Sequence, residues 1–450
     1  MGSKRVPYRV WIWVVVAHIL ALSWALRTEN WDFPDSDRYV QVALNLKHYG
    51  QLYARAWPQA VLAGQSIQEF SIRTPGYPGI ILGLGGETGH FALLLISQNV
   101  LSLLTIGVVL CWWARWAQPR GKEWVGALLC VLTFPAQLIY ANAVMSEIVL
   151  QAVVLAMLAS GLLYMKTQQL AYFLAVAAAS IAALLLKPVF YPLAAIIAVI
   201  GVALGWRTRQ LGFVLVGLLP TLVVMAYMEW NQQRTGYFHF SSIAEINMLH
   251  YNAAGVVRQL DGPQAEESWV AGVLREAALQ PNFATRQRLI QTRASAVLWA
   301  HPLVYAKQHL LGMAAFFLDP GRFDISEFLN LDPLPGGGFL AQARSGGLWT
   351  AIQRLPLGLM SGLGLVLLAN LGRLVLAVRG FWHLRQAQKW ACYGRWLALG
   401  LVCYVAGLTG PLGAARFLVP VWPLLLGLAL AGLKSGMVED AKPATDVASV

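Results

Sequence analysis

The sequence predicts an all-α protein of the polytopic membrane class, with about ten transmembrane helices. Of its 450 residues, 58% are hydrophobic and only 12% are charged, whereas a soluble protein carries about 25% charged residues. This composition argues against a cytosolic enzyme, a disordered protein and a coiled coil. The apolar residues fall into long runs, which favours a single membrane domain over residues 1–450 rather than several soluble domains.

Ten apolar stretches approach the roughly 20 residues that a membrane-spanning helix needs. Backbone polar groups in lipid must be paired within their own segment, so we expect each stretch to be helical. The predicted spans are Val10–Leu26, Phe91–Ala114, Trp124–Val144, Ile148–Met165, Leu170–Leu186, Val189–Trp206, Leu211–Met228, Leu355–Val378, Trp396–Gly410 and Phe417–Leu433. Another apolar segment, Leu303–Leu318, carries Lys307 and His309, and we expect an interfacial or re-entrant helix there.

Short basic blocks between the spans predict their orientation. Lysine and arginine are enriched in the cytoplasmic loops of membrane proteins, and with ten spans every block falls on one side. The blocks lie at residues 4–9, 115–122, 166, 207–209, 379–395 and 434. Both termini and the tail at residues 435–450 are then cytoplasmic. Residues 27–90 and 229–354 form two large external segments, which an enzyme at the outer membrane face needs and a pure channel or carrier does not.

The net charge of +12 comes largely from these basic blocks between the spans. In a soluble protein it would suggest a nucleic-acid partner, but here the basic residues are topology signals, so we expect no nucleic-acid binding. The four cysteines lie in or beside apolar runs without metal-ligand spacing. They predict small buried side chains rather than a disulfide framework.

Three acids, Asp32, Asp35 and Asp37, follow the first predicted span. A positioned carboxylate, either Asp35 or Asp37, can take the proton from an acceptor hydroxyl or amine, which typically adds about 10²–10⁴ in rate. The two could alternatively hold a divalent cation through oxygen ligands. Asp35 could also simply cap a helix, although that accounts for one acid and not for three.

A surface helix is predicted directly after these acids. Its apolar positions recur with helical spacing, which indicates an amphipathic helix. They are Tyr39, Val42, Ala43 and Leu46. We expect this helix to start at Pro34 and Asp35, to end at Gly50 and to lie along the membrane surface.

Three cations lie at the predicted outer ends of other spans. Arg73 precedes a turn stiffened by prolines, and it either anchors lipid headgroups or binds a lipid-linked phosphate in fork geometry. Lys187 ends a span, where a cation also simply complements the helix dipole. Arg416 begins the last span, where a cation is unfavourable, so it indicates an anionic partner.

Further polar residues share the predicted outer side. Glu147 begins the fourth span and either favours the helix N-terminus or serves as a second acid of the site. Glu245 and His250 are candidates for the acceptor side, together with Ser241, Asn247 and Tyr251. None of the external histidines has metal-ligand spacing, and packing is an equally simple explanation for each.

Several short segments carry a family resemblance. In chain order they are Pro34–Tyr39 with Ala43 and Gly50, Arg73–Pro78, Ser146–Glu147, Lys187–Pro188, His301–Pro302, and Arg416–Pro420 with Pro423. With its helix layout, the chain resembles bacterial polyprenyl-phosphate-sugar-dependent glycosyltransferases of the GT-C superfamily, relatives of protein O-mannosyltransferases and of the aminoarabinose transferase acting on lipid A. The resemblance implies a GT-C fold with amphipathic periplasmic helices, in the inner membrane of a bacterium.

The resemblance also implies roles for individual residues. The family's catalytic acid lies four residues before a Tyr, as Asp35 does here, but relatives often have Asp-Glu where this chain has Asp35-Ser36, which leaves Asp37 as a rival. Arg73 and Arg416 match the family's phosphate-binding cations, and Lys187 matches more loosely. Some branches use a metal and others do not, so a divalent cation is left open.

The implied reaction is a single displacement with inversion at the periplasmic face. A sugar passes from a polyprenyl-phosphate donor to a glycan, lipid or protein acceptor, and Asp35 takes the acceptor proton. A transporter or flippase is the alternative. Such proteins carry charges near the bilayer midplane, whereas the interiors of the helices predicted here are almost free of charge. A lipid-linked-sugar ligase or polymerase of another fold would need its chemistry in a later loop.

Overall fold

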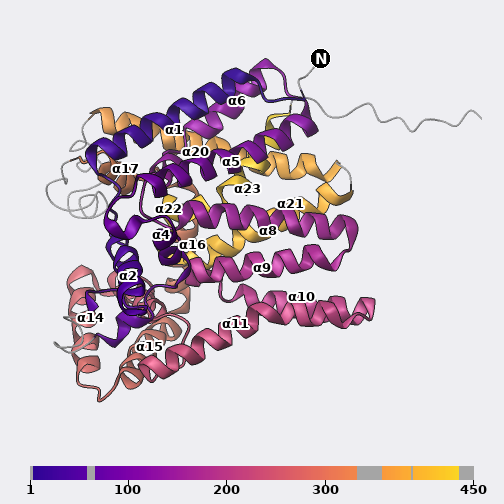
Figure 1. The fold of residues 1–450 in the computed structure, drawn as a ribbon. Coiled ribbons are helices and arrows are strands. Elements are labelled where there is room, and N and C mark those ends of the chain that lie inside the picture. The colour runs from indigo at the N-terminus through magenta and orange to yellow at the C-terminus, as the bar shows by residue number, and fades with distance from the viewer. Residues whose placement is uncertain (1–3, 58–65, 332–356, 387–388, 435–450) are drawn as a thin grey trace, which may run out of the picture.

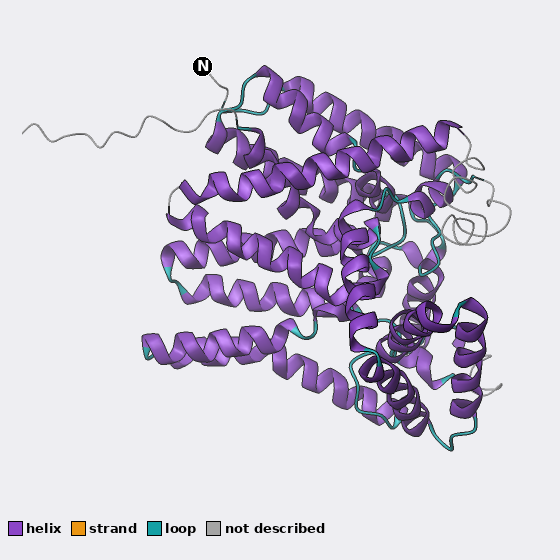
Figure 2. Cartoon of the chain, turned by 180° about the vertical axis from the view of Figure 1, so that it is seen from behind, coloured by secondary structure: helices purple, strands orange, loops and turns teal. Residues whose placement is uncertain are grey.

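The computed structural model describes residues 4–57, 66–331, 357–386 and 389–434, which form helices joined by turns (Figure 1; Figure 2). This part of the chain contains no strand, so the predicted all-α class is confirmed. The predicted tail at residues 435–450, and residues 332–354 of the second external segment, lie outside the described residues.

Among the described residues, eight helices are long and apolar enough to cross a membrane, or nine if a bent pair is counted as one span. The eight are α1 (Tyr8–Thr28), α5 (Ala92–Ala117), α8 (Glu147–Thr167), α10 (Leu193–Thr208) with the short turn before it, α11 (Leu211–Thr235), α20 (Leu357–His383), α21 (Lys389–Thr409), and α22 with α23 (Ala415–Leu418, Trp422–Leu433). The predicted span at Leu170–Leu186 is α9, an apolar helix of 17 residues. About ten membrane helices were predicted, and the described helices agree with that number.

The shorter helices gather at one end of the long ones. They are α2 (Ser36–Tyr49), α4 (Gly76–Gly83), α12 (Ile243–Asn247), α13 (Ala254–Asp261), α14 (Pro263–Ala278), α15 (Phe283–Ala300), α16 (Pro302–Leu318) and α17 (Arg322–Phe328). Figure 1 shows the long helices side by side, with α2, α14 and α15 beyond one end and the turns joining α8 to α9 and α10 to α11 at the other. The described parts of both predicted external segments therefore share one end. Helix α16 is not among the candidate spans.

One predicted span, Trp124–Val144, is wrong as a continuous helix. Helix α6 (Gly121–Leu132) and helix α7 (Pro135–Ala141) meet at an angle of 53°. Pro135 lacks an N–H to continue the helix, and its ring disfavours helical backbone at the residue before it. The chain then leaves helical geometry again before α8 begins at Glu147.

Arg373, inside the predicted span Leu355–Val378, holds this break. It is buried in α20 and donates hydrogen bonds to the Thr133 carbonyl oxygen at 3.2 Å, to Thr133 Oγ1 at 2.5 Å and to the Cys130 carbonyl oxygen at 3.4 Å. Its guanidinium lies 5.6 Å from the ring of Phe134 and 5.2 Å from that of Trp422. A cation at a helix C-terminus is favourable, so Arg373 stabilises the carbonyl end of α6.

Buried amides pair the backbone where other helices are interrupted. Gln98 donates to the Ala143 carbonyl at 2.8 Å and Asn99 to the Ala141 carbonyl at 3.1 Å, just before α8. Gln151 donates to the Val419 carbonyl at 2.7 Å, where α22 gives way to α23. Unpaired backbone groups are costly away from water, so these amides allow irregular segments deep in the helix bundle.

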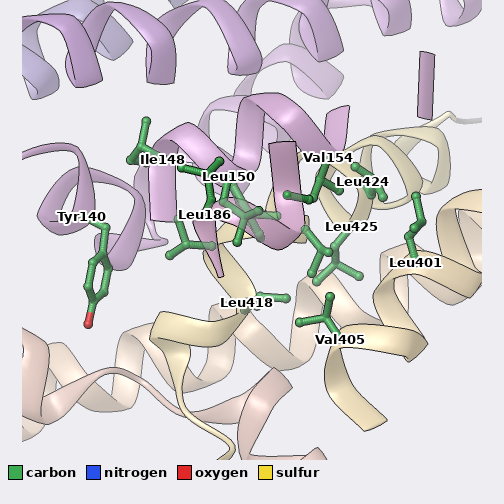
Figure 3. Close-up of a cluster of buried hydrophobic side chains, with 14 of the residues drawn as sticks. Tyr140, Ile148, Leu150, Val154, Leu186, Leu401, Val405, Leu418, Leu424 and Leu425 are labelled. Carbon is green, nitrogen blue, oxygen red and sulfur yellow. The ribbon is translucent and has the colours of Figure 1, made fainter. Parts of the chain in front are cut away.

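A buried apolar core packs α8 against α9, α21 and α23. Figure 3 shows Leu150 and Val154 of α8 with Leu424 and Leu425 of α23, and all four side chains are buried. Leu418 of α22 belongs to the same core. Close packing of this kind leaves little freedom to shift, so it fixes the start of α8 relative to the start of α22.

We expect Arg373→Met to lower the unfolding temperature of the detergent-solubilised protein. The substitution leaves the α6 carbonyls without their charged donor, which costs about 1–3 kcal/mol. Arg379→Met, in the same helix but exposed, is the matched control. Equal unfolding temperatures for the two variants would contradict a stabilising role for Arg373.

Candidate functional site

Asp35 occupies the N-cap position of α2, but its side chain makes no capping hydrogen bond. Its two carboxylate oxygens instead accept from two arginines distant in the sequence. Oδ1 pairs with Nη2 of Arg73, and Oδ2 accepts from Nη2 of Arg416 at 2.7 Å. Capping therefore does not explain Asp35. The predicted helix itself is confirmed, because α2 spans Ser36–Tyr49 and ends at Gly50, whose φ of +64° suits glycine.

Glu147, the first residue of α8, is the second carboxylate of this assembly. Its side chain is fully buried, and Oε1 accepts from Lys187 Nζ and from Arg416 Nε, both at 2.6 Å. Arg416 thus bridges Glu147 and Asp35. We call the five residues Arg73, Asp35, Arg416, Glu147 and Lys187 the charge cluster. It unites the starts of α2, α8 and α22 with the turn before α4 and the end of α9.

The charge cluster is not electrically balanced. Three cations face two carboxylates, so its formal charge is +1. The side-chain exposures are 0% for Glu147, 10% for Arg73, 14% for Lys187, 19% for Arg416 and 23% for Asp35. Asp35 is therefore the most exposed member of the cluster. A buried surplus of positive charge is unfavourable by itself and is relieved by an added anion.

The pKa of Asp35 reflects this surplus. Burial alone would raise the pKa of the carboxyl group, but the charges of Arg73, Arg416 and Lys187 outweigh it and hold the pKa at about 2. Asp35 is consequently ionised at neutral pH, and it is a weak base as long as both arginines stay on it.

Close backbone contact explains how the turn after Arg73 reaches the cluster. A Cβ atom at Gly76 would lie 2.6 Å from the carbonyl oxygen of Leu185, near the end of α9. Glycine therefore lets this turn pack against the segment that carries Lys187. Aromatic rings flank the cations, since Arg73 lies 5.1 Å from the ring of Tyr39 and Lys187 lies 5.4 Å from that of Phe417.

Two acids that sequence analysis did not single out lie near Arg416, and one of them is hydrogen-bonded to its segment. Asp319 accepts a hydrogen bond from the backbone N–H of Ala415 at 2.9 Å and so fixes the start of α22. Asp324 is buried and accepts from the Tyr140 hydroxyl at 2.9 Å. Burial, with help from Asp319, raises the pKa of Asp324 to about 7. The only sequence signal was the Asp-Pro-Gly turn that begins at Asp319, which is common in turns of every kind.

Asp35 and Asp37 line different cavities. A cavity of about 330 Å³ is lined by Asp35, and a second of about 510 Å³ is lined by Asp37 and Asp32. Burial, together with the charges of Asp37 and Glu327, raises the pKa of Asp32. Asp37 makes no ion pair within the described residues. Asp35 is thus the acid that joins the cations to a cavity.

The remaining site predictions separate in space. His250 lines the 330 Å³ cavity together with Asn247 and Tyr251. Glu245 is buried and does not line either of the two cavities described above, and burial raises the pKa of its carboxyl group. Glu245 belongs to α12, in the small helical unit formed by α12 to α15, and makes no ion pair with the charge cluster.

The described residues contain no group of three or more His, Cys, Asp or Glu side chains placed to hold a metal ion. Asp35 and Asp37, considered above as a pair of cation ligands, do not face one another. Both oxygens of Asp35 are occupied by arginines, and Asp37 opens onto the other cavity.

The ion pairs of Asp35 predict a specific acid dependence of stability. The pKa of Asp35 is lowered from 3.8 to about 2 in the folded protein, so its contribution is complete above about pH 5 and is lost as the pH falls towards 2. The stability difference between the unmodified protein and Asp35→Asn should therefore shrink as the pH falls. Thermal unfolding measured from about pH 6 downwards tests this.

Asp37→Asn is the control for this pH series, because Asp37 lies two residues away without an ion pair in the described part of the chain. Its stability difference from the unmodified protein should not show the change towards pH 2 that is expected from the loss of the Asp35 ion pairs. A difference between the unmodified protein and Asp35→Asn that stays constant with pH would contradict the ion-pair assignment.

Comparison with known proteins gives a likeness in structure. No family model matches the chain, and no curated protein matches it. It is similar to the crystal structure of ArnT from Cupriavidus metallidurans bound to undecaprenyl phosphate, with 17% identity and a TM-score of 0.37 over 94% of this chain and 77% of that chain. For ArnT in the apo state the values are 18%, 0.35, 94% and 76%.

Proposed function

We propose that the protein is a membrane glycosyltransferase that moves a sugar from a polyprenyl-phosphate donor to an acceptor. The observation that carries the proposal is the charge cluster, which has a surplus positive charge and meets a cavity at a single carboxylate, Asp35. The order of the family-like segments supports the same reading, since each cluster residue comes from one of them.

In this proposal the cations bind the donor phosphate. A sugar on a lipid phosphate carries one negative charge, and the departing lipid phosphate carries about −1.5 to −2 at neutral pH. Arg73, Lys187 and Arg416 therefore stabilise the products of bond breakage more than the intact donor. Electrostatic stabilisation of developing charge is usually the largest single contribution to catalysis.

The donor also releases the base. With both oxygens of Asp35 paired to arginines, its pKa is too low for efficient proton transfer. A donor phosphate that takes over Arg73 and Arg416 neutralises these charges and lets the pKa of Asp35 rise. The base therefore becomes stronger when the donor is in place, which discourages reaction steps without it.

The proposed reaction is a single displacement. The acceptor oxygen or nitrogen attacks the anomeric carbon while the bond from that carbon to the phosphate oxygen breaks. The electron pair leaves with the phosphate, and the acceptor proton passes to Asp35. One displacement inverts the configuration at the anomeric carbon. Glu147 is a positioning residue here, because it is fully buried and holds Arg416 and Lys187.

The donor's tail would lie in an apolar cavity of about 870 Å³ between α7, α17 and α20. Ile139 of α7 and Ile325 of α17 line this cavity, and their chain neighbours Tyr140 and Asp324 are hydrogen-bonded to each other. The cavity thus adjoins the segments that support Arg416. The proposed location is a bacterial inner membrane, with the cluster at the periplasmic face and the basic loops in the cytoplasm.

Asp35→Asn should lower transfer by about 10²-fold or more, because the acceptor proton loses its base. We would measure release of undecaprenyl phosphate from a panel of undecaprenyl-phosphate sugars by mass spectrometry, in native membranes that supply the acceptor. Asp37→Asn is the matched control and should keep near-normal turnover. Normal turnover in Asp35→Asn would exclude it as the base, and loss only in Asp37→Asn would move that role to Asp37.

Arg416→Met should weaken binding of undecaprenyl phosphate by about tenfold to a hundredfold, the effect of losing a charged donor. The variant should fold, because Asp35 keeps Arg73 and Glu147 keeps Lys187. Binding to purified protein is measured in detergent, with the exposed Arg288→Met as control. Unchanged affinity in a folded Arg416→Met variant would remove the phosphate role.

A further inference from the structure

The cavity of about 330 Å³ beside Asp35 is built by segments far apart in the chain. Asp35 lies at the start of α2, Gln68 in the short helix at Ile67–Phe70, Asn247 at the end of α12, and Gln287 in α15. Its volume is at the lower end of the roughly 300–1,000 Å³ of small-molecule pockets. It therefore suits one small unit of a larger molecule.

Gln287 makes this cavity a built site. Its side chain is only 1% exposed, it lines the cavity, and its Oε1 has no hydrogen-bond partner. Buried polar atoms in folded proteins are nearly always paired, and an unpaired one is costly. Because Gln287 lines the cavity, a rotation of its amide would let this oxygen accept a hydrogen bond from a ligand, such as one from a hydroxyl group.

Most of the other lining residues are uncharged, and they contribute both polar and apolar surface. Gln68 and Asn247 contribute uncharged amides, while buried Ile72 and Leu249 contribute apolar surface. A sugar ring has the same two-sided character, with hydroxyl groups on its edge and C–H groups on its faces. A lining of this kind recognises a neutral hydroxylated ring better than a plain hydrocarbon or a strongly charged group.

The charges around the cavity argue against an anionic unit. Arg73, Lys187 and Arg416 do not line it, and Asp35 contributes a negative charge. Arg38 lines it, but its guanidinium already pairs with Glu69 at 3.5 Å. A phosphate or carboxylate in this cavity would meet the negative charge of Asp35, and Arg38, which already pairs with Glu69, is the lysine or arginine that lines it.

A turn of π-helix at Met248–Ala253 places His250 and Tyr251 at the same cavity. Such turns are rare and are frequent at functional sites. Gln308 of α16 stabilises this one by donating to the Tyr251 carbonyl at 2.7 Å. A Cβ atom at position 255 would lie 2.2 Å from the Gln308 amide nitrogen, so Gly255 is needed for this contact.

We propose that this cavity is the acceptor subsite and that it holds a neutral, hydroxylated sugar ring of a glycan or glycolipid acceptor. The inference rests on the proposed function, because it takes Asp35 as the base. Gln287 accepts a hydrogen bond from a ring hydroxyl, and the attacking hydroxyl lies against Asp35. Gln287 is thus a residue for acceptor recognition and does not touch the phosphate of the donor.

The test uses methyl hexopyranosides as probes and glycerol phosphate as an anionic probe, with binding to purified full-length protein followed by saturation-transfer NMR. At least one methyl glycoside should bind, and Gln287→Leu should weaken that binding about tenfold through loss of the hydrogen bond. Gln287→Leu should still fold, because it removes an unpaired buried oxygen. The exposed Gln291→Leu, one turn further along α15, is the matched control and should bind normally.

Undecaprenyl phosphate binding is measured on the same samples. Two results would overturn the acceptor assignment and leave the proposed function standing, provided that undecaprenyl phosphate binding depends on Arg416. The first is that no glycoside binds, and the second is that glycosides bind equally to Gln287→Leu and Gln291→Leu. Preferential binding of glycerol phosphate also overturns the assignment. If undecaprenyl phosphate does not bind, or binds equally well to Arg416→Met, the proposed function is overturned, and the acceptor subsite with it.

Discussion

The bridge that Arg416 makes between Asp35 and Glu147 is the interaction on which the site depends. One guanidinium group uses Nη2 for the first carboxylate and Nε for the second, at 2.7 and 2.6 Å. A lysine ammonium is a point charge and lacks this planar fork. Several contacts elsewhere in the fold position the residues of this bridge. Asp319 fixes the backbone beside Arg416, the break between α6 and α7 leads the chain to Glu147, and the apolar core of α8 and α23 sets the distance between them.

The two carboxylates of the charge cluster have different environments and hence different chemistry. Glu147 is fully buried and holds two cations through one oxygen, so its task is to keep positive charge in place. Asp35 is more exposed and opens onto a cavity. An anion that enters the cluster displaces Asp35 from its arginines more easily than Glu147 from its cations. Asp35 is partly exposed, so water can solvate its carboxylate when the ion pairs break. The exchange of anions proposed for the donor phosphate follows from this asymmetry.

The sequence predicted well what depends on periodicity and helix-end electrostatics. The helix after Asp35 ends at Gly50, and Arg416 at a helix start does have anionic partners, although in this structure they are protein carboxylates. It failed where tertiary contacts override local pattern. Trp124–Val144 reads as one apolar run, and the carbonyl groups at the break before Pro135 accept hydrogen bonds from Arg373 of α20. Asp35 and Asp37 could not be separated, because two residues of spacing do not tell which cavity each carboxylate faces.

The charge cluster and the largely uncharged cavity meet at one residue, which limits where the proposed transfer can take place. Among the described residues, Asp35 alone belongs both to the charge cluster and to the lining of the 330 Å³ cavity. In the proposed reaction a charged donor is bound on one side of this carboxylate, and a neutral acceptor on the other. A group transferred between them must pass within reach of Asp35, since proton transfer needs hydrogen-bond distance. Asp37 faces a different cavity without cations of the cluster, so it could act as the base only if the donor and the acceptor both met elsewhere.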